Sequence, residues 1–149
     1  MDNHLVLAAL GADRTGIVDE ISRIASETRC NITDSRMVVM GQEFSIIMMI
    51  SGAWDAIAKF ENHIPVLEER LNLAIITKRT EARQPQREAI PYRVDVIALD
   101  NPGIVHDIAN FFASQQINIE SLETSTYAAP HTGSPMFALN MTVNIPAKA

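Results

Sequence analysis

The sequence is short of several residue types, and each shortage excludes a class of protein. One cysteine in 149 residues leaves no disulfide framework within the chain and no cysteine-rich zinc site. Lysine and arginine number 12 against 18 acidic residues, and this net charge of −6 argues against direct nucleic-acid binding. No apolar run approaches the roughly 18 residues of a membrane span. A secretory signal has a basic stretch before its apolar region, and no such stretch precedes the first apolar run of this sequence. We therefore expect a cytoplasmic protein without a membrane segment.

The most informative feature that is present is an internal duplication. Residues 13–32 align without gaps with residues 100–119, and seven of the twenty aligned pairs are identical, against about one expected by chance. Both copies repeat apolar residues at the spacing of one face of an amphipathic helix. The offset of 87 residues is too long for a solenoid repeat and indicates a duplicated domain.

The first copy has the pattern of a ferredoxin-like βαββαβ unit, which belongs to the α+β class. Apolar runs predict strands at Leu5–Leu10, Asn31–Met40, Phe44–Ile50 and Leu73–Thr77. Apolar residues at helical spacing predict helices over Thr15–Arg29 and Ile57–Leu71. Pro65 should kink the second helix or split it in two.

The second copy begins the same way but is about 25 residues too short for the last helix and strand. Its strands are predicted at Tyr92–Leu99, Asn118–Tyr127 and Met136–Ile145, with a helix at Gly103–Gln115. The predicted organisation is one unit over residues 1–80, a polar linker over residues 81–90, and an incomplete unit over residues 91–149. In this topology the missing strand would pair with the first, so Tyr92–Leu99 should be an exposed edge. We expect a truncation, engineered or unusual, or a dimer that covers this edge.

The turns between the first strand and first helix of each copy are candidate ligand sites. They read Asp13-Arg14-Thr15-Gly16-Ile17 and Asp100-Asn101-Pro102-Gly103-Ile104. Glycine allows close approach to the backbone, and a helix N-terminus offers unpaired N–H groups and partial positive charge to a carboxylate. Asn101 followed by Pro102 also fits a helix N-cap and first helical position.

Asn31 and Asn118 open the second strand of each copy, where an amide can cap the preceding helix or hold the charged groups of a ligand. Capping and turn geometry alone would explain all of these residues, and the duplication does not discriminate between structure and binding. No other pattern indicates chemistry: the four histidines fit no metal motif, and Cys30 aligns with Ile117 as a small buried apolar group. No catalytic residue, metal ligand or cofactor site is predicted.

At this level the chain resembles tandem ACT domains, which are small amino-acid-sensing regulatory modules, and more specifically the glycine cleavage system transcriptional repressor group. The resemblance rests on the D-R-x-G-I-V and D-x-P-G-I-V turns, on N-I at the second strand, and on the long segment Asn118–Phe137. Thr15 stands where the family usually has proline. The ligand positions that the resemblance implies are Asp13, Gly16, Ile17 and Asn31 in the first copy and Asp100, Asn101, Gly103, Ile104 and Asn118 in the second.

The resemblance implies a non-enzymatic homo-oligomer that senses a small amino acid, with glycine expected. It would control a transcription activator by protein contact, without touching DNA. One alternative is a regulatory fragment or subunit of a formyltetrahydrofolate deformylase or amino-acid biosynthetic enzyme. Another is a dimerisation scaffold that binds no ligand.

Overall fold

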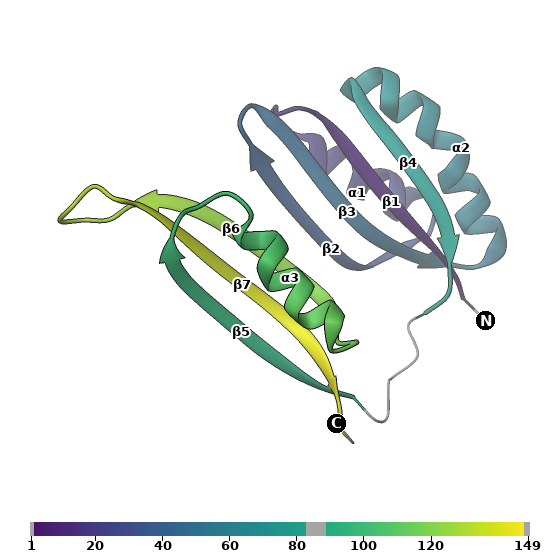
Figure 1. Cartoon of the computed structure of the whole chain (residues 1–149). Coiled ribbons are helices and arrows are strands. Elements are labelled where there is room, and N and C mark those ends of the chain that lie inside the picture. Colours follow the sequence, from purple (N-terminus) through teal and green to yellow (C-terminus); the bar gives the residue numbers. More distant parts are fainter. Residues whose placement is uncertain (1, 83–88, 148–149) are drawn as a thin grey trace. The chain divides into compact units, whose positions relative to one another are not determined.

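The computed structural model describes residues 2–82 and 89–147. The chain divides into two compact units, Met1–Arg83 and Gln84–Ala149, each with one antiparallel sheet (Figure 1). The linker predicted over residues 81–90 falls largely outside the described residues. Its last two residues, Ala89 and Ile90, belong to the first strand of the second unit.

The first unit has the predicted βαββαβ order. Its elements are β1 (Asn3–Ala12), α1 (Ile17–Glu27), β2 (Asn31–Met40), β3 (Glu43–Gly52), α2 (Trp54–Leu71) and β4 (Leu73–Thr80). The sheet order is β2-β3-β1-β4, with antiparallel neighbours, and both helices cover the same face (Figure 1). Pro65 does not divide α2, which runs from Trp54 to Leu71, so of the two expected outcomes the split helix is wrong and the kink stays a prediction. Burial of Ile64 and Leu67 on either side of the proline offsets the one backbone hydrogen bond that it removes.

The core of the first unit lies between the sheet and its two helices. Alternate residues of β1 and β3 point into it, as period-two strands require. Those strand residues are Leu5, Leu7, Ala9, Phe44, Ile46, Met48 and Ile50. The helices contribute their apolar stripes, which include Ile17, Ile21 and Ile24 of α1 and Ile57, Phe60 and Leu67 of α2. The periodicity in the sequence therefore marks the buried face of each element.

The second unit is a shorter β-α-β-β arrangement. Its elements are β5 (Ala89–Leu99), α3 (Ile104–Ser114), β6 (Asn118–Ala128) and β7 (Pro135–Pro146). The sheet order is β5-β7-β6, so β5 is an edge strand, which confirms the prediction. Within the described part of this unit, no second helix or fourth strand follows. Its core is formed by Phe137, Leu139, Met141 and Val143 of β7, packed against partly buried residues of α3.

Candidate functional site

The two predicted turns have the same backbone geometry. Gly16 and Gly103 each form the N-cap of the following helix, with φ of 96° and 87°, in the left-handed region. The N–H of Asp13 donates to the carbonyl of Gln42 over 3.1 Å, and that of Asp100 donates to the carbonyl of Pro135 over 3.0 Å. Each turn is therefore tied to the hairpin formed by the next two strands of its unit, which are β2 and β3 in the first unit and β6 and β7 in the second.

Glycine is needed in these turns because of backbone conformation and not because of crowding. A Cβ atom at Gly16 or at Gly103 would meet no atom within 4 Å, whereas a positive φ is costly for any residue with a side chain. The expectation that Asn101 caps the helix, with Pro102 as its first residue, is wrong. The cap is Gly103, and the Asn101 side-chain amide instead donates to the carbonyl of Leu99 over 3.3 Å.

The start of each helix presents backbone donors that the helix itself does not use. Neither N-cap makes a side-chain hydrogen bond. The first donor to reach the cap carbonyl is the N–H of Glu20 in α1, over 3.0 Å, and that of Asp107 in α3, over 2.9 Å. The N–H groups before these donors lie at the positive end of the helix dipole, where a carboxylate is stabilised.

The predicted ligand residues of the turns divide by burial. Asp13, Gly16, Asp100, Asn101 and Gly103 are exposed. Ile17 is only 2% exposed and belongs to the core, and Ile104 is partly buried against the second core. The side chain of Ile17 is therefore not available to a ligand, and the backbone N–H of Ile104 already donates to the carbonyl of Asn101 over 3.4 Å.

The structure does not bring Asn31 or Asn118 to the turn of its own unit. Asn31 pairs with Ser51 of β3, whereas Ala12, which precedes the first turn, pairs with Glu43. These partners are eight residues apart on one strand, or about 27 Å. The same separation holds in the second unit, where Asn118 pairs with Asn144 and Leu99 with Met136. The structure therefore does not bring a turn and an asparagine of one unit together into a single site.

Arg14 is a residue of the first turn that the sequence reasoning overlooked. Its Nη2 donates to the carbonyl of Arg70, at the end of α2, over 3.2 Å. The Arg70 guanidinium in turn pairs with the Glu20 carboxylate at 3.0 Å, which also pairs with Arg23 at 2.8 Å. The sequence did contain a signal for Arg14: the aligned position of the second turn is Asn101, so only the first turn carries a cation there.

These arginines also set the ionisation of the carboxylate between them. The hydrogen bond from Arg70, together with the charge of Arg23, holds the pKa of Glu20 below its ordinary value. Glu20 therefore stays ionised and neutralises part of the positive charge near the start of α1. Arg14 makes no ion pair with it and remains the cation of the turn.

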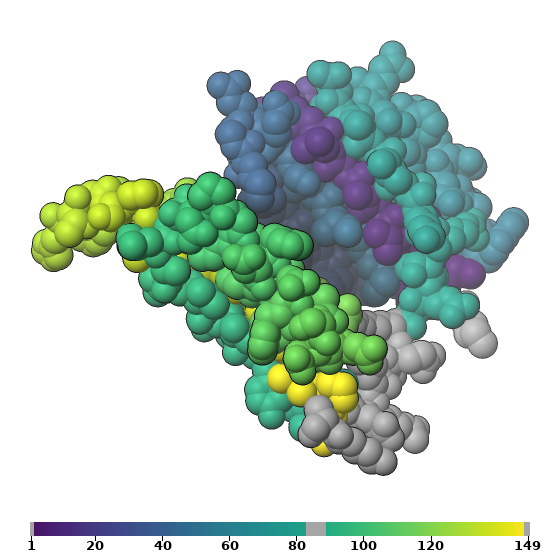
Figure 2. Space-filling model, in the orientation of Figure 1, coloured from purple at the N-terminus to yellow at the C-terminus, as the bar shows by residue number. Residues whose placement is uncertain are grey.

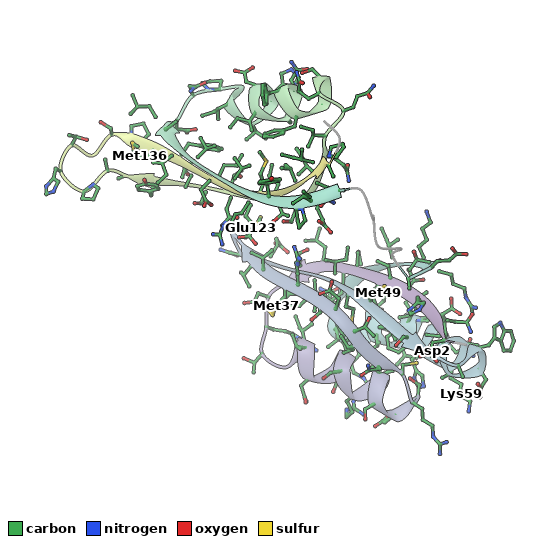
Figure 3. The ribbon with its side chains drawn as sticks, turned by 90° about the horizontal axis from the view of Figure 1, so that it is seen from below. Asp2, Met37, Met49, Lys59, Glu123 and Met136 are labelled. Atoms are coloured by element: carbon green, nitrogen blue, oxygen red, sulfur yellow. The ribbon has the colours of Figure 1, made fainter. Side chains whose placement is uncertain are left out.

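The first sheet also has a hollow on the face away from its helices. It has a volume of about 220 Å³, and its lining includes Val6, Asp34, Ile47 and Met49. Met49 is labelled on β3 in Figure 3. The lining is mainly apolar, which suits a hydrophobic contact better than the charged groups of an amino acid.

Two further tests concern metals and membranes. Within residues 2–82 and 89–147, no cluster of three or more histidine, cysteine, aspartate and glutamate side chains is placed to hold a metal ion. None of the helices described here combines the length and apolarity that crossing a membrane requires.

The fold and the two glycine-capped turns define a protein built from two small ferredoxin-like α+β modules. The family model for the ACT domain matches residues 3–78, which is the first unit almost exactly as its strands bound it. The chain belongs to the ACT domain family.

Relatives that span the chain carry the assignment further. The chain is 38% identical over 149 residues to the glycine cleavage system transcriptional repressor of Escherichia coli K12. The alignment covers 99% of this chain and 77% of that protein. A solved structure provisionally assigned as such a repressor superimposes with a TM-score of 0.71 at 32% identity and covers 100% of this chain and 84% of that one. A protein of unknown function from Galdieria sulphuraria gives a TM-score of 0.76 at 27% identity, with 98% and 84% covered.

These relatives confirm the resemblance to the repressor group. The Escherichia coli relative is named as a transcriptional repressor and not as an enzyme. The chain is thus homologous over nearly its whole length to a regulator of transcription.

Proposed function

We propose that the chain is a cytoplasmic, non-enzymatic regulator that binds a small amino acid, with glycine the first candidate. It acts on a transcription activator through protein contact. The observation that carries this proposal is the 38% identity with the Escherichia coli repressor across nearly the whole chain. The acidic net charge of −6 supports a protein partner over direct contact with DNA.

The turn geometry supports an amino acid as the ligand. A carboxylate can accept hydrogen bonds from the free N–H groups at the start of α1, with the Arg14 cation on the same turn. The exposed Asp13 carboxylate, also on this turn, offers a counter-charge to the ammonium group. Asn31 lies about 27 Å from this turn, so it does not contribute to a ligand site at the turn of its own unit.

A bound ligand can regulate a partner if it favours one conformation of the chain over another. A coupling free energy of about 1–3 kcal/mol changes the affinity for the partner about 5- to 150-fold. A weakly bound metabolite is sufficient for this, since the coupling depends on its differential affinity for the two states.

Titration calorimetry with glycine tests the ligand, with glycine ethyl ester as a control that keeps the ammonium group and lacks the carboxylate. We expect saturable heat with glycine and none with the ester. Absence of heat with every common amino acid at millimolar concentration would favour the ligand-free scaffold. Hydrolysis of formyltetrahydrofolate by the purified chain would favour the enzyme alternative.

Valine substitutions of the turn glycines test the location of the site. Gly16→Val and Gly103→Val each force a side chain into a left-handed backbone, so the occupied turn should lose glycine binding. Gly133→Val is a matched control, because Gly133 also has a positive φ of 70° and open space around it but lies in the β6–β7 loop. Circular dichroism should stay nearly native for all three variants. Binding retained by both turn variants would refute the assignment of the site.

A further inference from the structure

The second sheet has a hollow on the face that is turned away from its helix. The hollow has a volume of about 560 Å³, which lies within the range of small-molecule sites, and its lining comes from all three strands. The charged and amide side chains of this lining are Arg93 and Asp95 of β5, Glu123 of β6 and Asn140 of β7. Figure 3 shows Glu123 on this side of the sheet. In Figure 2, α3, coloured green, lies over the opposite side, which faces the viewer.

The register of the strands orders these groups into adjacent rows across the sheet. Asn140, on the central strand, pairs with Asp95 on one side and with Glu123 on the other. The two carboxylates therefore flank the amide, on strands that lie about 10 Å apart. Arg93 lies one row along, opposite Thr142, and its Nε donates to the Asp95 carboxylate over 3.4 Å. One cation and two anions thus meet at one place on the sheet.

Most of the hydrogen-bonding capacity of these side chains is unused. The contact between Arg93 and Asp95 is long and engages only Nε, so both terminal nitrogens of the guanidinium remain available. Within the part of the chain that the structure describes, neither the Glu123 carboxylate nor the Asn140 amide makes a hydrogen bond, although Asn140 is partly buried. The hollow therefore offers a ligand both donors and acceptors.

The duplication provides an internal comparison for this hollow. In the first unit, the row that corresponds to Asp95, Asn140 and Glu123 consists of Ala8, Ile47 and Arg36. The hollow at that place has only about 220 Å³ and a mainly apolar lining. The same sheet is thus built there without the two carboxylates and the amide. The fold itself does not require these groups in the second unit, which favours a role in binding.

We infer that this hollow binds a free α-amino acid with an aliphatic side chain. The Arg93 guanidinium donates to the ligand carboxylate through its two terminal nitrogens, as a bidentate pair. The ligand ammonium group lies over Asn140, between the carboxylates of Asp95 and Glu123, and donates to them. The opposite charges of Arg93 and Asp95 are 3.4 Å apart, which matches the short separation of the two charges in an α-amino acid.

The next row of the sheet accepts the aliphatic side chain of the ligand. This row consists of Ile97, Ala138 and Ser125, and all three line the hollow. Ala138 is the smallest residue that β7 presents on this face, and the exposed Ile97 offers an apolar surface beside it. Burial of an aliphatic side chain against Ile97 stabilises the complex. Glycine lacks this side chain and leaves the row empty.

The site is separate from the turn at Gly103. That turn follows Leu99, which is four residues, or about 14 Å, beyond Asp95 along β5. The inference therefore does not rest on the proposed binding of glycine at the turns or on the transcription activator.

Titration calorimetry of the full chain with L-leucine tests the ligand class. Isoamylamine is the control that lacks the carboxylate, and isocaproate is the control that lacks the ammonium group. We expect saturable binding of leucine, and binding of each control weaker by about tenfold or more, because each loses one charge-assisted contact. Equal affinity for leucine and either control would overturn the recognition of both charges. Absence of saturable leucine binding up to about 50 mM would refute the site.

Single substitutions test the location of the site. Arg93→Gln and Glu123→Gln each remove one charge from an exposed side chain, so the fold should be kept, and each should weaken leucine binding by about tenfold or more. Arg36→Gln is the matched control, because Arg36 holds the position of Glu123 in the first unit, and it should bind leucine as the original chain does. Glycine binding should be equal in all three variants, which separates this site from the turns. Unchanged leucine binding in Arg93→Gln or in Glu123→Gln, or an equal loss in Arg36→Gln, would overturn the inference.

Discussion

Replacing Gly16 by alanine isolates the conformational cost of the first turn. Gly16 has a φ of 96°, and a Cβ atom there would meet nothing within 4 Å, so crowding contributes nothing to the cost. What remains is the penalty for an L-residue in the left-handed region, about 1–2 kcal/mol. Asparagine tolerates that region better, and Gly16→Asn should therefore cost less than Gly16→Ala.

The aromatic residues allow the two units to be followed separately. The single tryptophan, Trp54, lies on α2 of the first unit, and both tyrosines, Tyr92 and Tyr127, lie in the second. In urea, Gly16→Ala should lower the free energy of unfolding that tryptophan fluorescence reports by about 1–2 kcal/mol. With a slope of about 1–3 kcal/mol per molar urea, the midpoint falls by roughly 0.3–2 M. The transition reported by tyrosine absorbance should stay in place.

Gly103→Ala should produce the reverse pattern, because Gly103 caps α3 with a φ of 87°. An unchanged tryptophan transition in Gly16→Ala would show that the turn does not need a left-handed residue. Equal shifts of both signals would show that the two units unfold as one cooperative body. Either result would refute the reasoning from two separately capped modules.

Two further predictions concern the helices. Ile24→Ala should cost the first unit about 2–5 kcal/mol in urea unfolding, because Ile24 is 6% exposed. Phe111→Ala should cost only about 0.5–1.5 kcal/mol, because Phe111 is 58% exposed and mainly loses the edge-on contact with Phe112 at a centroid distance of 5.1 Å. Equal losses for both variants would contradict this difference in burial. Glu20 should titrate below 4.5 by NMR, since Arg70 and Arg23 stabilise its charged form, and Arg70→Leu should raise that pKa. The pKa of Glu20 is lower in the folded state than in the unfolded state, so its ion pairs stabilise the fold above pH 4.5. This stabilisation is lost as the pH falls through the pKa of the folded state. An unchanged pKa of Glu20 in Arg70→Leu would exclude Arg70 as the cause of the shift.

Local pattern was sufficient for most of the fold. The second strand was predicted at Asn31–Met40, and β2 has those bounds. The stripe of Ile17, Ile21 and Ile24 identified the buried face of α1. These predictions succeed because a helix or strand with one buried side repeats its apolar residues at the period of its own geometry.

The start of the second helix shows where local pattern was not sufficient. Asn101 and Pro102 have the preferences of a cap and a first helical residue, yet the helix begins after Gly103. The link from Asp100 to the β6–β7 hairpin constrains the chain before the helix, and the glycine absorbs the resulting left-handed turn. Residue preferences alone do not include this tertiary hydrogen bond.

The sequence by itself determined the duplication and the order of strands and helices, because both follow from the spacing of residues along the chain. Only the tertiary structure decided that Asn31 lies about 27 Å from the Gly16 turn, and that the Ile17 side chain belongs to the core. The physical reason is that strand direction and register decide which distant residues meet, and neither is encoded in any local stretch.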